Sequence, residues 1–269
     1  MKYIFLLFIM GITLFANLIE SQVLSVNEEQ TQATIKIDKI DVGMSGFIFH
    51  RLSQKHSSIL KNIVVSSYDA KTKIATLSIS EFDGLKNNAL PEGKWKVRVG
   101  DTAALAFGYS RALLISPNEE IYYKITKNTK NIQWIHPDLF ATMLSNNGHP
   151  TPLKSDFYEM CSATSVGIVF FYLEENVFTL DCKSFKVLNI SKAPLKQTSV
   201  ELPFYTRVQE IDEAWWGEGS EPLTSYEPHY YKLMLEFNKE NTKLLDIVKH
   251  SKKEEVQNLL KDKNSGDNI

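Results

Sequence analysis

The sequence lacks an excess of charge of either sign. Its 269 residues contain 30 lysines and arginines against 32 aspartates and glutamates, so the formal net charge at pH 7 is −2. A nucleic-acid-binding domain needs a concentrated basic footprint, and strong attraction to an anionic membrane also requires positive charge. The charge balance therefore argues against both as partners of this chain.

Residue patterns that carry catalytic or metal chemistry are also missing. The six histidines are scattered, and none lies in a His-Glu-x-x-His zinc signature. His50 and His56 lie six residues apart across an expected turn, where solvated histidines are more common than a metal site. There is no Gly-x-Ser-x-Gly elbow, phosphate-binding glycine loop or Ser-x-x-Lys signature. We therefore expect no catalytic residue, no metal site, no cofactor and no enzymatic activity.

The sequence has only one long hydrophobic run. Ile4–Ala16 follows Lys2, a layout typical of a secretory signal peptide and too short for the roughly 20 residues of a membrane-spanning helix. We assign residues 1–21 to a signal peptide, with an uncleaved anchor as the alternative and no defined cleavage position. No cysteine closely follows the run, so a lipid-anchored N-terminus is not expected. The expected location is the cell envelope, either the periplasm or the outer surface.

Cysteine is scarce, and both cysteines lie after the hydrophobic run, at Cys161 and Cys182. In an oxidising compartment such a pair is usually a disulfide. Closing a loop of this length stabilises a protein by about 3 kcal/mol in the chain-entropy model. The alternatives are two buried thiols or half of a metal site, but no histidine or further cysteine lies at ligand spacing. We therefore predict a disulfide between Cys161 and Cys182.

Residues 30–135 have the pattern of a β-rich domain. Short apolar or alternating segments are separated by turn residues about every eight to twelve positions, which is typical of a small barrel or sandwich. The expected strands are 35–42, 47–50, 63–65, 74–79, 97–99, 103–107, 112–115 and 121–125.

Residues 136–237 combine helices and strands. Pro137 suits the first position of a helix that ends at Gly148, and Asp156 or its neighbour Ser155 can begin a second helix. A three-stranded antiparallel meander is expected next, over 166–173, 177–181 and 184–190. A charged C-terminal helix is expected to begin near Leu233. Residues 238–269 are assigned to this helix and to a disordered end. The predicted fold class is therefore α+β, with mainly antiparallel strands.

Aromatic residues gather between Glu201 and Phe237. Flat aromatic rings can bind carbohydrate or peptide, although rings that pack a connector onto the sheet are the more common case. The candidate aromatic surface consists of Trp215, Trp216, Tyr230 and Tyr231.

Several blocks of the sequence resemble one protein family. They are Val42–His50, His56–Ile59, Tyr109–Asn118, Ile135–Ala141, Asp156–Phe157 with Cys161, and Val177–Cys182. Over roughly residues 30–235, the chain resembles the N-terminal domain of the plasminogen-binding proteins of epsilon-class Proteobacteria. The resemblance implies an exported, non-enzymatic surface protein that binds host plasminogen through its lysine-recognising kringle modules.

Members of this family are associated with a C-terminal lysine, whereas this sequence ends in Ile269. The nearest candidates for plasminogen contacts are therefore Lys252, Lys253, Lys261 and Lys263. A solvated helix face with ion pairs one turn apart is an alternative explanation for these lysines. The alternative function is a periplasmic structural or assembly module that binds an envelope polymer or a partner protein. The sequence does not indicate an oligomeric state.

Overall fold

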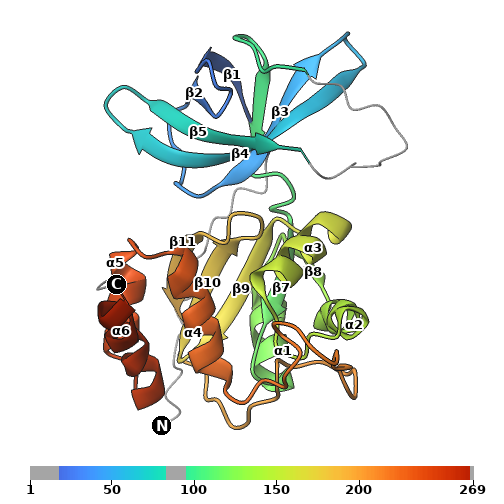
Figure 1. Ribbon diagram of the computed structural model, residues 1–269, viewed down its shortest axis with the longest axis vertical. Coiled ribbons are helices and arrows are strands. Elements are labelled where there is room, and N and C mark those ends of the chain that lie inside the picture. The colour runs from blue at the N-terminus through green and yellow to red at the C-terminus, as the bar shows by residue number, and fades with distance from the viewer. Residues whose placement is uncertain (1–17, 83–94, 267–269) are drawn as a thin grey trace, which may run out of the picture.

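The computed structural model describes residues 18–82 and 95–266, with side chains described as far as Lys261. A β-barrel lies above a second sheet, which helices cover on its other side (Figure 1). The α+β class expected from the sequence is confirmed. Most of the predicted signal peptide lies outside the described residues. Within the described part, no helix is both long and apolar enough to cross a membrane.

Six antiparallel strands form the closed barrel, in the order β1-β2-β5-β4-β3-β6. They are β1 (Ile19–Val26), β2 (Gln32–Lys36), β3 (Ser45–Arg51), β4 (Ser57–Asp69), β5 (Ile74–Glu81) and β6 (Thr102–Leu105). The barrel closes where β1 pairs with β6, from Ile19 opposite Leu105 to Gln22 opposite Thr102. Closure pairs the edge strands and so removes free sheet edges.

The first strand, β1, was not predicted from the sequence. Only Val23 of this strand is buried, so the strand has little of the apolar alternation that identifies a half-buried strand. The opposite error affects residues 97–99, which were predicted to be a strand and are not in one. There the backbone N–H of Val97 donates a hydrogen bond of 2.7 Å to the side chain of Gln30.

The second sheet has five strands in the order β11-β10-β9-β7-β8. They are β7 (Arg111–Ile115), β8 (Gln133–Ile135), β9 (Ile168–Leu173), β10 (Asn176–Asp181) and β11 (Val187–Lys192). The last three form the antiparallel meander expected from the sequence. Strand β7 pairs in parallel with both β8 and β9, so this sheet is mixed.

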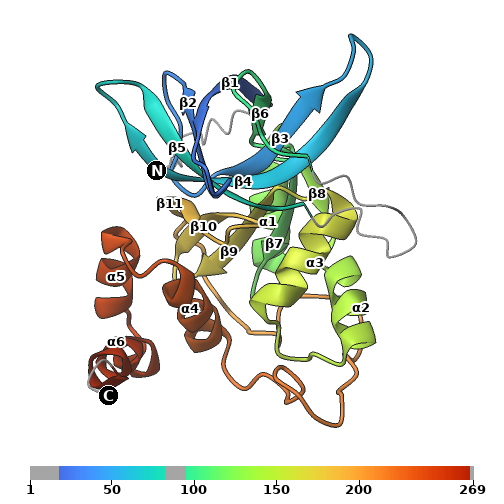
Figure 2. The same ribbon diagram turned by 45° about the horizontal axis from the view of Figure 1, so that its top comes forward.

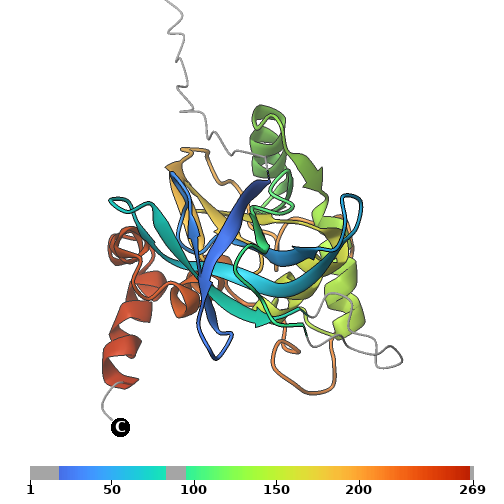
Figure 3. The ribbon, with the colours of Figure 1, turned by 90° about the horizontal axis from the view of Figure 1, so that it is seen from above.

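Six helices accompany the second sheet. They are α1 (Glu119–Asn128), α2 (Pro137–Asn147), α3 (Lys154–Thr164), α4 (Tyr226–Phe237), α5 (Thr242–Lys249) and α6 (Glu254–Gly266). In the view from above, the barrel covers the sheet while α5 and α6 lie to one side (Figure 3).

The second sheet is buried on both faces. In β9, Val169 and Phe171 pack into the core shared with the helices, whereas Ile168 and Phe170 belong to the core shared with the barrel. Every residue of β9 and β10 is buried. Near-continuous apolar runs are the pattern expected of strands that are covered on both sides.

Two predictions about the middle of the chain were wrong. Residues 121–125 form part of helix α1 and not a strand. Asn118 caps this helix by accepting a 3.0 Å hydrogen bond from the backbone N–H of Ile121. Two glutamates in the first turn further stabilise the helix, because their negative charges interact favourably with the helix dipole. In addition, the barrel ends at β6, because residues 111–135 supply β7 and β8 to the second sheet, with helix α1 between them, instead of strands to the barrel.

The C-terminal part is not one helix but three. Helix α4 ends at Phe237 and is capped by Asn238, whose side-chain amide donates hydrogen bonds to the carbonyls of Met234 and Phe185. Helix α5 ends at Lys249, and α6 begins at Glu254 and runs to Gly266. Residues 264–266, predicted to be disordered, therefore belong to a helix.

The predicted disulfide between Cys161 and Cys182 is present. It joins α3 to the residue that follows β10, with the two Cα atoms 6.0 Å apart and a sequence separation of 21. Both cysteines are buried.

The carboxylate of Asp181 links the barrel to the second sheet. Its Oδ2 atom accepts hydrogen bonds from the backbone N–H of Ser45 (3.0 Å), from the hydroxyl of Ser45 (2.7 Å) and from the hydroxyl of Tyr109 (2.8 Å). Its Oδ1 atom accepts from the backbone N–H groups of Lys183 and Ser184. Asp181 is fully buried, so these five donors replace the water that a carboxylate would otherwise need. Burial, with the nearby charge of Asp181, raises the pKa of Tyr109 well above its ordinary value.

We expect Asp181→Ala to lower the free energy of unfolding by about 3 kcal/mol, because it leaves buried donors without an acceptor. Urea denaturation measures this change. Asp41→Ala is the matched control, since Asp41 is exposed, and we expect a change within about 0.5 kcal/mol. Equal stability of the two variants would contradict the role assigned to Asp181.

We expect replacement of both Cys161 and Cys182 by serine to cost about 3 kcal/mol of stability. Thermal unfolding with and without a reductant checks this. The reductant should lower the melting temperature of the original protein towards that of the variant and leave the variant unchanged. A reductant effect on the variant of the same size would show that the disulfide is not the cause.

Candidate functional site

Only half of the predicted aromatic surface is on the surface. The side chains of Trp215 and Trp216 are 96% and 82% exposed, whereas those of Tyr230 and Tyr231 are 0% exposed. The two tyrosines lie on the face of α4 that packs against the second sheet, and the Tyr230 ring lies 5.3 Å from that of Phe171. The prediction that Tyr230 and Tyr231 form a surface was therefore wrong.

The two tryptophans lie in the connection between β11 and α4. We call residues 210–221 of this connection the tryptophan loop. Before the tryptophans, the hydroxyl of Ser145 donates to the Asp212 carboxylate (2.6 Å), and the backbone N–H of Ala214 donates to the carbonyl of Gly148 (3.0 Å). After them, the backbone N–H of Thr151 donates to the carbonyl of Gly219 (3.1 Å). The loop is therefore held on both sides of the tryptophan pair.

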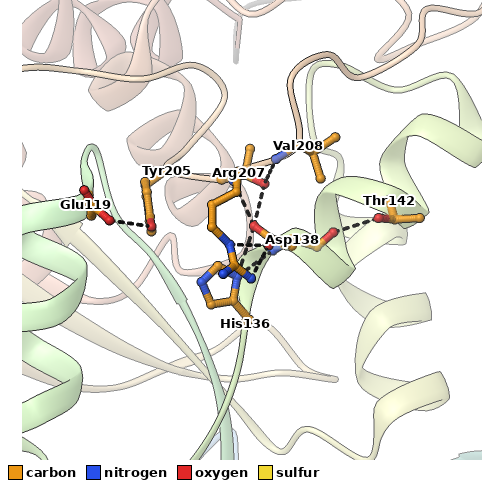
Figure 4. A network of polar contacts seen from close by, with 8 residues as sticks. Glu119, His136, Asp138, Thr142, Tyr205, Arg207 and Val208 are labelled. Carbon is orange, nitrogen blue, oxygen red and sulfur yellow. Dashed lines mark hydrogen bonds and ion pairs between the residues drawn. The ribbon is translucent and has the colours of Figure 1, made fainter.

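The connection is tied to helix α2 by an ion pair between Asp138 and Arg207 (Figure 4). The guanidinium of Arg207 contacts Oδ2 of Asp138 at 2.6 and 2.7 Å, and the backbone N–H of Arg207 donates to Oδ1 at 2.8 Å. The hydroxyl of Thr206 also donates to Oδ1. Burial acts to raise the pKa of Asp138, but these hydrogen bonds outweigh it and hold the pKa below its ordinary value.

His136 begins helix α2 within the same network. Its Nδ1 atom accepts a hydrogen bond from the backbone N–H of Asp138 (3.2 Å), which caps the helix. Its ring lies against those of Tyr122 and Tyr205, and burial lowers the pKa of His136. The His-Pro-Asp segment, which contributed to the family resemblance, thus has a helix-capping and tethering role.

The candidate lysines of the C-terminal helices differ in their surroundings. The ammonium of Lys253 lies 2.6 Å from the Glu227 carboxylate, which is only 3% exposed. Lys253 therefore compensates a buried charge and has a structural role. The side chain of Lys252 is 82% exposed and reaches Glu175 only at 3.4 Å.

Lys261 is also exposed, and its ammonium donates a 2.8 Å hydrogen bond to Asn258, one turn earlier in α6. The side chain of Lys263 lies outside the described residues. Lys252, Lys253 and Lys261 are all exposed, but only Lys253 pairs with a buried carboxylate. Lys252 and Lys261 are therefore the candidate lysines that are exposed and have no such structural pairing.

A cleft of about 230 Å³ lies between the barrel and α3. Its walls include Phe47, Phe107 and Val166, and the ammonium of Lys183 lies 4.3 Å from the centre of the Phe47 ring. The sequence did not predict this cleft, because its walls come from segments more than a hundred residues apart. Among residues 18–82 and 95–266, no group of three His, Cys, Asp or Glu side chains could hold a metal ion.

The family model described as "Plasminogen-binding protein pgbA N-terminal" matches residues 18–234. This range contains the barrel, the second sheet and the tryptophan loop, and ends before Lys252. Two relatives named plasminogen-binding protein PgbA, from two strains of Helicobacter pylori, are 28% and 27% identical over 180 residues.

The matched residues amount to 66% of this chain and to 38% and 39% of the relatives, so the match spans about two fifths of the relatives' length. No solved structure matches the chain. The family resemblance seen in the sequence is confirmed over both sheets, and the chain belongs to the family described by the plasminogen-binding protein pgbA N-terminal domain.

Proposed function

We propose that this chain is an exported, non-enzymatic protein of the cell surface that binds plasminogen. The observation that carries the proposal is the family match over residues 18–234, together with relatives that are named as plasminogen-binding proteins. The buried disulfide supports the export part, because such bonds persist in oxidising compartments and are rare in the cytosol.

We propose that the contact depends on Lys252 and Lys261. A kringle module recognises a cation and an anion that are held some distance apart, as the family resemblance implies. On α6, exposed Glu254 and Lys261 are seven residues apart and so lie on the same face of the helix, about 10 Å apart along its axis. Lys252 lies just before the helix and next to the same acidic first turn. This arrangement can offer a kringle module both charges from within the chain.

The second candidate function is a periplasmic module that binds an envelope polymer or a partner protein through the tryptophan loop. The exposure of Trp215 and Trp216 favours it, because large exposed apolar side chains that lie together commonly mark interaction sites. This site lies beside α2. Helices α5 and α6 lie at the opposite end of the helical layer that covers the second sheet (Figures 1 and 2). The two candidate functions can therefore be tested separately.

We expect the variant Lys252→Ala with Lys261→Ala to bind immobilised plasminogen at least about tenfold more weakly than the original protein, since a few central contacts dominate most interfaces. Surface plasmon resonance, with and without a lysine analogue, measures this. Lys39→Ala with Lys55→Ala, which removes two exposed barrel lysines, is the matched control and should bind normally.

Removing α5 and α6 would be a poor test, because Leu244, Val248 and Val256 are fully buried in the core. Analogue-sensitive binding that survives in the Lys252/Lys261 variant would contradict the role of these two lysines. Absence of binding by the original protein would contradict the proposed function itself.

We expect protease added to intact cells to degrade the protein, because plasminogen can reach only a surface-exposed molecule. Immunoblotting before and after treatment checks this, with a known periplasmic protein as the control. Protection of both proteins would favour the periplasmic alternative.

A further inference from the structure

The tryptophan loop has an unusual combination of exposure and order. Trp215 and Trp216 are the two most exposed large hydrophobic residues in the described part of the chain. Scattered exposed apolar residues are normal, but adjacent large ones suggest an interaction site. Indole rings have a large apolar surface that favours burial in a core or an interface. The exposure of both rings therefore points to a partner that covers them.

Hydrogen bonds hold the backbone on both sides of the two indole rings in place. Besides the contacts of Asp212 and Ala214 with α2, the hydroxyl of Thr151 donates a 2.7 Å hydrogen bond to the carbonyl of Glu221. Gly148, where α2 ends, has so little room that a Cβ atom there would lie 2.6 Å from Ala214. Because both arms of the loop are anchored, binding needs less ordering of its backbone than binding to a slack loop.

The charge around the tryptophans has one sign. Five acidic residues lie within the tryptophan loop: Glu210, Asp212, Glu213, Glu218 and Glu221. No lysine or arginine occurs between Arg207 and Lys232, although the whole chain is close to neutral. All five acidic residues are exposed, and Glu213 and Glu218 closely flank the two rings. A local negative potential of this kind attracts cations.

We propose that the tryptophan loop is a docking site for a basic, lysine- or arginine-containing segment of a partner protein. The indole faces attract ammonium and guanidinium groups, and Glu213 and Glu218 lie where they can pair with the same cations. An anionic membrane would be repelled by these carboxylates, and a neutral sugar would leave them unused. The proposal deepens the second candidate function by naming the chemistry of the partner. It does not depend on plasminogen binding.

Fluorescence anisotropy with a labelled peptide of alternating glycine, lysine and arginine tests the proposal. We expect the peptide to bind the full chain at 50 mM NaCl and more weakly at 300 mM, because salt screens exposed charges. Trp215→Ala with Trp216→Ala should weaken binding about tenfold. Glu213→Gln with Glu218→Gln should weaken it about fivefold and reduce the effect of salt. All four side chains are exposed, so we expect the variants to fold, and thermal unfolding checks this.

Glu28→Gln with Glu240→Gln is the matched control, because it removes the same charge from exposed positions elsewhere. Normal binding by this control supports a local site, and an equal loss would overturn it. The proposal is also overturned if the peptide does not bind, if the tryptophan variant binds normally, or if a neutral oligosaccharide or phosphatidylcholine vesicles bind in its place. A negative result with the peptide would not change the outcome of the plasminogen assay. The docking proposal and the plasminogen proposal can therefore be rejected independently of each other.

Discussion

The carboxylate of Asp181 receives donors from both halves of the molecule, and the arrangement of the rest depends on it. Ser45 reaches it from the barrel, Tyr109 from the crossing between the halves, and Ser184 from the turn after β10. A buried carboxylate is costly unless its oxygens are satisfied, so the barrel cannot shift far from the sheet without losing these bonds. The neighbouring disulfide holds α3 to the same end of β10. One buried charge thus determines where the barrel, the second sheet and a helix meet.

The second sheet is the central layer of the molecule. Its strand residues alternate between a core shared with the barrel and a core shared with the helices, so both faces are used for packing. The candidate binding features lie at the periphery, namely the tryptophan loop beside α2, the exposed face of α6 and the cleft beside α3.

The parts that were predictable from the sequence are those in which local pattern and tertiary environment agree. The run 166–173 and its two successors predicted the meander because each strand is bounded by turn residues. The pattern failed where tertiary contacts decide. Strand β1 has one buried residue and exists because β2 and β6 lie on either side of it. For Tyr230 and Tyr231 the sequence left a surface role and packing onto the sheet as alternatives, since the orientation of α4 determines which of its rings are hidden. Asp181 was missed because its donors Ser45 and Tyr109 are distant in the sequence.

The closure of the barrel has a consequence for the order in which this chain can fold. Strand β1 can form a hairpin with β2, its neighbour in the sequence, but its second partner, β6, lies much further along the chain. Pairings between distant segments form slowly because a long loop must be closed first. Asp181, which docks the barrel through Ser45, lies further along the chain still. Closing the barrel and docking it on the second sheet therefore both require segments that are distant in the sequence to come together.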